Sequence, residues 1–176
     1  QILSRNIDIV LNDKNKNKIQ ILQSNLKRLN FDTKIFNKDF TNYDFKQKYN
    51  YIVIDAPCSA IGTIRKNPEI FFKDKGPNLE ELIIIQERML EKASLLLHKE
   101  GYILYMVCSF LKKETEEQID KFLRKKNGFE LYNFELVEEN KEYFKLIKNK
   151  FMFTLPDTIF DKNIDGYFAA YLKRTK

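Results

Sequence analysis

The stretch Tyr51-Ile-Val-Ile-Asp-Ala-Pro-Cys-Ser-Ala60 decides the fold, together with a second stretch, Tyr102-Ile-Leu-Tyr-Met-Val-Cys-Ser109. Each is a short apolar run bounded by turn residues, which predicts a buried strand of a parallel sheet. Each run ends beside one of the two cysteines of the chain, Cys58 or Cys108. Because chemistry in an open α/β sheet collects at the carboxyl ends of strands, we expect both thiols in one crevice, with Asp55 three residues before the first.

Paired thiols beside a carboxylate suggest covalent catalysis, since a thiolate of lowered pKa is a strong nucleophile. The ordinary alternative for either cysteine alone is a small buried hydrophobic residue. A disulfide is disfavoured because nothing marks the chain as secreted. Zinc is also disfavoured, because two cysteines and the distant His98 lack ligand spacing, so no metal site is expected. His98 itself is predicted to end a helix, where the helix dipole favours it.

The composition fits one globular domain with a sizeable core. The 176 residues are 43% hydrophobic and 14% aromatic, which argues against disorder. Thirty-one basic and 25 acidic residues give a net charge of +6, which permits a polyanionic partner without requiring one. The sequence contains neither a long apolar segment nor a signal-peptide pattern, so we expect a cytoplasmic protein.

Helical and strand patterns alternate along most of the chain. Asn78, with Glu81 three residues later, predicts a capping box at the start of a long helix. Helices are expected at 14–29, 78–100 and 114–126. Strands are expected at 7–11, 33–36, 51–55 and 102–107, and near 129–136, 150–154 and 167–172. This order predicts an α/β fold whose sheet is mostly parallel with an antiparallel edge.

An acidic residue follows each of the first three predicted strands. Asp13 comes after the first, Asp39 shortly after the second, and Asp55 ends the third. Any one of them alone is more often a helix cap or turn residue. Three at the carboxyl ends of strands fit a nucleoside site, in which carboxylates accept hydrogen bonds from ribose hydroxyls and from an adenine amino group.

With these residues assembled, the chain resembles the Sun (Fmu) family of bacterial ribosomal RNA 5-methylcytosine methyltransferases. Three motifs carry the resemblance, at 55–69 (DAPCSAIGTIRKNPE), 107–109 (VCS) and 165–170 (DGYFAA). The resemblance implies a Rossmann-like class I methyltransferase sheet that binds S-adenosylmethionine, and an RNA substrate, closest to small-subunit ribosomal RNA. The family's Pro-Gly-Gly-Lys loop would come just before residue 1. The expectation is therefore a partial methyltransferase domain over residues 1–176 whose sheet lacks its first strand.

The resemblance also implies a role for each candidate residue. Asp13 matches the family's ribose-binding acid and Asp39 the acid beside the adenine, while Asp55 borders both the cofactor and the target base. Cys108 matches the nucleophile, and Cys58 the second thiol, which is needed for release. Ile61, Asn67 and Val107 depart from the residues usual in the family, at positions that affect loop packing more than chemistry.

Arg65 and Lys66, inside the first motif, follow its cysteine loop and can hold RNA phosphates, although solvated surface charge is an equal alternative for both residues. Two functions from different classes remain. One is a catalytic RNA cytosine-5 methyltransferase, and the other is a non-catalytic RNA-binding or assembly fragment without cofactor binding. A thiol redox protein is disfavoured because the sequence has no Cys-x-x-Cys motif.

Overall fold

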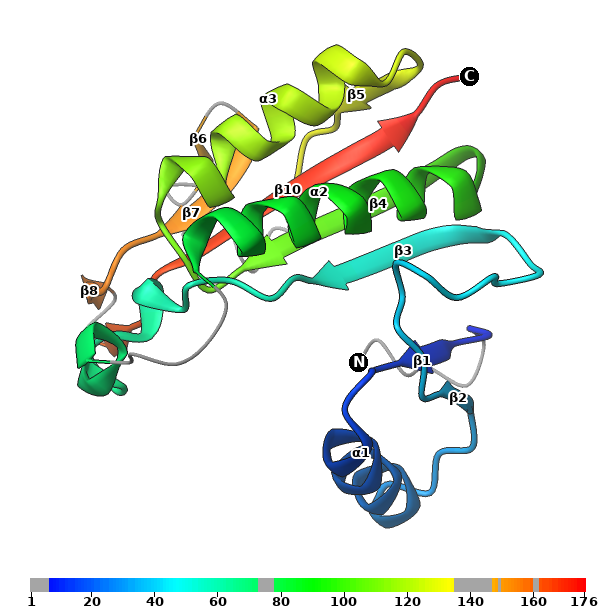
Figure 1. Ribbon diagram of the computed structural model, residues 1–176, viewed down its shortest axis with the longest axis horizontal. Helices are drawn as coiled ribbons and strands as arrows, with labels where there is room; N and C mark the ends of the chain where they lie inside the picture. Colours follow the sequence, from blue (N-terminus) through cyan, green and yellow to red (C-terminus); the bar gives the residue numbers. More distant parts are fainter. Residues whose placement is uncertain (1–6, 73–77, 135–146, 149, 160–161) are drawn as a thin grey trace. The chain divides into compact units, whose positions relative to one another are not determined.

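The computed structural model describes residues 7–72, 78–134, 147–148, 150–159 and 162–176 (Figure 1). The chain divides into two units, Gln1–Phe45 and Lys46–Lys176, and each is considered by itself. Within the described ranges, the search for membrane-spanning helices finds none with the required length and apolar character.

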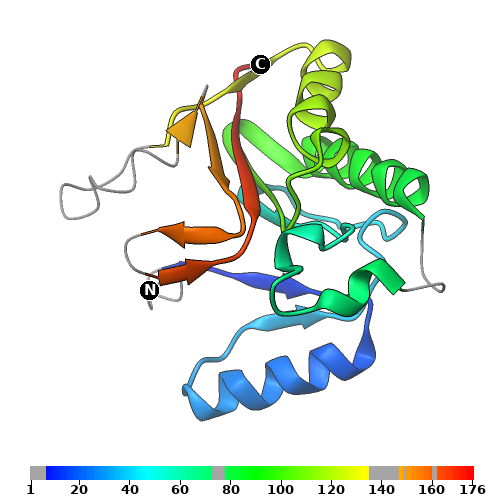
Figure 2. The same ribbon diagram turned by 90° about the vertical axis from the view of Figure 1, so that its left-hand side faces the viewer.

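The first unit is a β-α-β element. Its strands β1 (Val10–Asn12) and β2 (Lys34–Phe36) pair in parallel, and the helix α1 (Lys16–Arg28) connects them and lies alongside the pair (Figure 2). The Asn15 side chain caps α1 by accepting hydrogen bonds from two backbone N–H groups of the first turn. Ile19 and Leu26 form the buried side of the helix.

The second unit contains one sheet with the order β3-β4-β10-β7-β6. β3 and β4 pair in parallel, and the pairs formed by β10 with β4, β5 and β7 are antiparallel. A separate hairpin joins β8 and β9. The strands are β3 (Tyr49–Asp55), β4 (Leu97–Val107), β5 (Phe129–Leu131), β6 (Ile147–Lys148), β7 (Phe151–Thr154), β8 (Asp157–Ile159), β9 (Lys162–Ile164) and β10 (Tyr167–Arg174).

Two helices, α2 (Leu79–Leu96) and α3 (Glu116–Lys125), cover one face of this sheet (Figures 1 and 2). Alternate residues of β4 point to that face, and Ile103, Tyr105 and Val107 are fully buried there. The helices contribute Leu90 and Ile119, which are also fully buried. β10 adds the buried residues Phe168, Ala170 and Leu172 opposite those of β4, so the core of the second unit lies between β4, β10 and the two helices.

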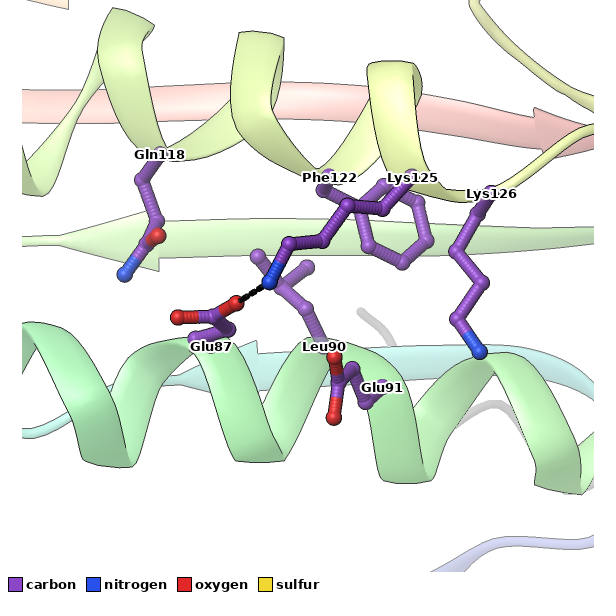
Figure 3. A pocket seen from close by; sticks show the side chains of 7 residues that line it. All are labelled: Glu87, Leu90, Glu91, Gln118, Phe122, Lys125 and Lys126. Atoms are coloured by element: carbon purple, nitrogen blue, oxygen red, sulfur yellow. Dashed lines mark hydrogen bonds and ion pairs between the residues drawn. The ribbon is translucent and has the colours of Figure 1, made fainter.

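Ion pairs join α2 to α3 beside a small hollow (Figure 3). Lys121 Nζ lies 2.7 Å from Glu87 Oε2, and Lys125 pairs with the other carboxylate oxygen. Hydrogen bonds from these two lysines hold the pKa of the Glu87 carboxyl below its usual value. We assign the hollow to helix packing, because it is lined by the Glu87–Lys125 pair and by the apolar side chains of Leu90 and Phe122 from the two helices.

The structure confirms the predicted fold class. The two parallel pairs, β1–β2 and β3–β4, belong to separate sheets in the described part of the chain. The predicted capping box is also present, since Asn78 Oδ1 accepts from Glu81 N at 2.9 Å and Glu81 Oε2 accepts from Asn78 N at 3.1 Å.

Several predicted boundaries are wrong. The long helix ends at Leu96, not at Gly101, so His98 lies in β4 and not at a helix end. The run Leu95-Leu-Leu97 favours continuing the helix, but residues from Leu97 onward pair with β3 and become strand. β5 ends at Leu131, and the last two residues of the strand expected near 129–136 lie outside the described residues. The short helices η1 (Ile61–Thr63), η2 (Pro68–Phe72) and η3 (Lys112–Glu114) and the β8–β9 hairpin were not predicted.

Replacing Asn78 with alanine is expected to destabilise the second unit by about 1 kcal/mol, because Glu81 N loses its acceptor at the start of α2. Urea unfolding followed by circular dichroism measures the change. Asn78→Asp is the matched control and should retain most of the stability, since aspartate offers an equivalent acceptor. Equal unfolding midpoints for wild type and Asn78→Ala would show that the cap does not stabilise α2.

Candidate active site

The parallel pairing of β3 with β4 brings the two thiols together. Asp55 at the end of β3 is opposite Met106 in β4, and Ala56 N extends the ladder by donating to Met106 O at 3.0 Å. Cys58 follows β3 and Cys108 follows β4 at the same edge of the sheet. Their sulfur atoms lie 3.2 Å apart, a hydrogen-bond separation, and both cysteines are free.

The two thiols have opposite pKa shifts. The hydrogen bond from Cys58 stabilises the thiolate of Cys108 and lowers the pKa of Cys108 to about 7, against the opposing effects of burial and of Asp55 and Glu114. The same hydrogen bond raises the pKa of Cys58, and burial raises it further. Cys58 therefore holds its proton, and Cys108 is the thiol that ionises near neutral pH.

Direct contact between main chains holds the cysteine segments against the closing Asp165-Gly166 segment. Gly62 N donates to Cys108 O at 3.0 Å, and Gly166 N donates to Gly62 O at 2.7 Å. A Cβ atom on Gly62 would lie 1.9 Å from Gly166 O and 2.9 Å from Cys108 O. Only glycine fits at position 62 without moving the backbone, so all three motifs of the sequence meet at this point.

Arg65 and Lys66, the two candidate phosphate-binding residues, form ion pairs with Asp165. Lys66 Nζ lies 2.6 Å from Asp165 Oδ2, and Arg65 Nη2 lies 3.3 Å from Asp165 Oδ1. The hydrogen bond from Lys66 is the main cause that lowers the pKa of the Asp165 carboxyl. The carboxylate is buried, but the arginine and lysine side chains remain 40% and 60% exposed. The pairing thus orients both cations and leaves them accessible to a ligand.

Two acids of this region were not identified from the sequence. Asp165 is part of the quoted closing motif, but its pairing with Arg65 and Lys66 spans about a hundred positions and has no local signal. Glu114 is fully buried, although it lies in the run Lys112-Lys-Glu-Thr-Glu-Glu117, whose composition is typical of a solvated helix start. Only the structure shows that its carboxylate contacts Ser59, the residue after Cys58.

The first unit carries the two other predicted acids at the carboxyl ends of its parallel strands. Asp13 directly follows β1, and its Oδ1 accepts from Asn15 N at 2.7 Å. Asp39 follows β2 by three residues, and its Oδ1 accepts from the hydroxyl of Thr41 at 2.6 Å, which lowers the pKa of the carboxyl. These turn contacts use Oδ1 of each residue, and Asp13 Oδ2 lies 4.0 Å from Lys18 Nζ. Both carboxylates can accept further hydrogen bonds from hydroxyl or amino groups of a nucleoside.

Among the described residues, no group of three or more histidine, cysteine, aspartate or glutamate side chains gathers in a way that could hold a metal ion.

Comparison with known proteins gives a consistent result. The model of the family described as "16S rRNA methyltransferase RsmB/F" matches residues 1–173. Ribosomal RNA small subunit methyltransferase B of Shewanella oneidensis is 33% identical over 124 residues, covering 69% of this chain and 29% of its own length. The protein of the same name from Vibrio vulnificus is 28% identical over 168 residues, covering 94% and 36%. The chain therefore spans about a third of the length of these relatives.

Solved structures show the same fold. The crystal structure of PH0851 superposes with a TM-score of 0.80 at 26% identity and covers 95% of this chain and 37% of that one. The structure of NSun6 from Pyrococcus horikoshii with SFG, an analogue of S-adenosylmethionine, gives a TM-score of 0.77 at 24% identity over 96% and 42% of the two chains.

Alkylation by iodoacetamide should follow the ionisation of Cys108, with half of the maximal rate near pH 7. Below that pH the thiol is protonated and the rate falls, whereas above it the rate reaches a plateau. Cys58→Ala removes the hydrogen-bond donor, so the midpoint should rise toward about 8.5, the ordinary value of a thiol. Mass spectrometry of the two cysteine peptides gives the rate at each site. A lower midpoint at Cys58 than at Cys108 would reverse the assignment of the thiolate.

Proposed function

The chain belongs to the 16S rRNA methyltransferase RsmB/F family, and from this we propose that it transfers a methyl group to carbon 5 of a cytosine in small-subunit ribosomal RNA through a covalent adduct with Cys108. The observation that carries the proposal is the pair of thiols 3.2 Å apart, of which Cys108 ionises near neutral pH. Covalent catalysis needs a nucleophile with a lowered pKa and a partner group within hydrogen-bond reach, and this pair supplies both.

Cys108 would make carbon 5 reactive. That carbon is a poor nucleophile in cytosine, but addition of the Cys108 thiolate at carbon 6 converts the ring to an enamine, whose carbon 5 is nucleophilic. S-adenosylmethionine, when bound, supplies the electrophilic methyl group. The target base has to leave its stack to reach the thiol, as in other enzymes that act on bases.

Cys58 would assist release of the product. While Cys108 is a thiolate, its hydrogen bond keeps the proton on Cys58. Once Cys108 is bonded to carbon 6, it no longer accepts this bond as an anion, so Cys58 can release its proton to solvent and become a thiolate. Cys58 then takes the proton from carbon 5, the electron pair forms the double bond between carbons 5 and 6, and Cys108 leaves as a thiolate.

Asp55 would contact the target ring where charge develops during addition. It is the exposed last residue of β3 and lies opposite Met106, two residues before Cys108, and its charge raises the pKa of the Cys108 thiol; these observations support a role near the reacting sulfur. Contact with N3 or with the exocyclic amine of the cytosine stabilises the adduct.

Asp13 and Asp39 would hold the nucleoside of S-adenosylmethionine, the methyl donor of this family. The chemistry of the donor set fits, because ribose hydroxyls and an adenine amino group donate hydrogen bonds and both carboxylates are acceptors at the carboxyl ends of parallel strands. Arg65 and Lys66, held by Asp165 and accessible, would contact RNA phosphates. Since the substrate is ribosomal RNA, we also propose a cytoplasmic location.

Replacing each cysteine with alanine should block a different step of the reaction in the full-length protein. Cys108→Ala should abolish both methylation and the covalent bond to RNA. Cys58→Ala should retain addition and methyl transfer but lose elimination, so a protein–RNA adduct should accumulate. A denaturing gel of the protein with methyl donor and a small-subunit RNA transcript shows the adduct as a slowly migrating band.

This band should disappear when Cys108 is also replaced. A band that persists without Cys108 and depends on Cys58 would exchange the two roles. Methylation that is unchanged in both variants would show that the thiols are only buried residues. Binding of RNA without any methylation by the wild type would support the alternative of a non-catalytic RNA-binding fragment.

Cofactor binding should weaken when Asp13 is replaced by alanine, because the nucleoside group that it accepts from is left unpaired. A loss of ~1–3 kcal/mol corresponds to roughly a 5- to 150-fold rise in Kd. Calorimetric titration of S-adenosylmethionine into the full-length protein measures this change. Asp32→Ala is the matched control, since Asp32 is exposed and precedes β2 at the opposite end of the strand pair. Equal affinities for Asp13→Ala and wild type would remove Asp13 from the site.

A further inference from the structure

Glu114 is a buried carboxylate that the mechanism above does not use. Its side chain is fully buried, and within the described residues no lysine, arginine or histidine lies within ion-pair distance of it. Burying a carboxylate without a cation costs several kcal/mol unless hydrogen bonds compensate. The hydrogen bonds of the Glu114 carboxylate, and the segments that they hold, therefore need to be identified.

Three donors from two segments surround the Glu114 carboxylate. Ser59 N donates to Oε1 at 2.8 Å, and the Ser59 hydroxyl donates to Oε2 at 2.6 Å. Gln86 Nε2 donates to Oε1 at 3.0 Å and also to Pro57 O at 2.9 Å. Because Pro57 and Ser59 are the two neighbours of Cys58, the carboxylate and the glutamine together fix the backbone on both sides of that cysteine.

The same cluster reaches the segment of the other cysteine. Ser59 Oγ lies 3.3 Å from Ser109 Oγ, and Ser109 directly follows Cys108. Since the Ser59 proton is directed to Glu114, the Ser109 hydroxyl is the donor in this contact. Behind the cluster, Gln118 Nε2 donates to Gln86 Oε1 at 3.3 Å, and the Tyr105 hydroxyl donates to Glu114 O at 2.9 Å. α2, α3 and β4 thereby anchor the carboxylate in place.

We propose that Glu114 is a positioning residue that holds Cys58 within hydrogen-bond reach of Cys108 and thereby enables the release step. The role of Glu114 in the release step rests on the proposed function, whereas its role in holding Cys58 beside Cys108 does not. The Glu114 carboxylate contacts Ser59, which follows Cys58, and Gln86, which holds the carbonyl of Pro57 on the other side of Cys58, so Glu114 acts through Cys58.

The negative charge of Glu114 and its positioning of Cys58 have opposite effects on the alkylation midpoint of Cys108, so the two roles can be told apart. The groups that influence Cys108 are Cys58 after β3, Asp55 at the end of β3, Glu114 in η3 and Tyr167 in β10. The negative charge of Glu114 opposes ionisation of Cys108, so loss of the charge alone lowers the alkylation midpoint of Cys108. Loss of position removes the hydrogen bond from Cys58 and raises the midpoint.

The experiment compares Glu114→Ala, Glu114→Gln and the control Glu117→Ala in the full-length protein, with iodoacetamide as the probe. Glu114→Ala should raise the Cys108 midpoint from about 7 toward about 8.5. Glu114→Gln keeps the shape of the side chain and an oxygen for Ser59 N, so its midpoint should lie at or below that of the wild type. Glu117 is exposed in the first turn of α3, and its replacement should leave the midpoint unchanged.

A double variant tests whether the effect passes through Cys58. In the Cys58→Ala background, Glu114→Ala should produce no further rise in the Cys108 midpoint. A full additional rise there would overturn the proposal, as would a fall of the midpoint in the single variant Glu114→Ala. If urea unfolding shows that Glu114→Ala does not fold, Ser59→Ala replaces it and should give a smaller rise, whereas an unchanged midpoint would overturn the proposal.

The catalytic consequence has its own measurement. Glu114→Ala should accumulate the protein–RNA adduct as Cys58→Ala does, and rescue by Glu114→Gln should reduce the adduct. Absence of methylation in the wild type would contradict the proposed function, and the alkylation midpoints would still decide the role of Glu114. If the wild type is active and Glu114→Ala raises the Cys108 alkylation midpoint without accumulating the adduct, Glu114 positions the thiols but has no role in product release.

Discussion

The parallel pairing of β3 with β4 is the constraint on which the candidate site depends. In a parallel pair both chains leave the sheet at the same edge, so the residues after Asp55 and after Val107 have to meet. An antiparallel pairing of the same two strands would place Cys58 and Cys108 at opposite edges. The registration, with Asp55 opposite Met106, then sets how far beyond the edge each sulfur lies. The helices α2 and α3 cover the strands, and Gln86 of α2 and Glu114 of η3 supply the polar side chains that hold the Cys58 loop.

The electrostatics around the sulfur atoms show which effect dominates. Asp55, Glu114 and burial each disfavour a thiolate at Cys108, and the hydrogen bond from Cys58 favours it. The net pKa lies below the ordinary value of a thiol, so short-range hydrogen bonds, chiefly the one from Cys58 with a smaller backbone contribution, outweigh two carboxylates and partial desolvation. The thiolate depends mainly on the neighbouring proton of Cys58, so the buried polar cluster that holds Cys58 in place matters for the reactivity of Cys108.

Sequence patterns predicted the parts of the molecule that depend on local chemistry. Alternating apolar runs located the strands that bear the cysteines, and the spacing of Asn78 and Glu81 identified the start of α2. The end of α2 could not be found in this way, because the pairing of Leu97 with Tyr49 is a tertiary contact that overrides helix propensity. Glu114 and Asp165 were missed for a related reason. A charged residue in a polar segment is normally exposed, and burial of these two depends on partners far away in the sequence.

The contact between Gly62 and Gly166 has a consequence for how such a chain can change over time. The obstacle to a side chain at position 62 is a main-chain oxygen, which every amino acid carries. No replacement at position 166 can therefore make room, and the cost cannot be shared between the two positions by compensating substitutions. Glycine is therefore required at position 62 whatever residue stands at position 166. Descendants of this sequence can vary the surrounding loops only while they keep this glycine.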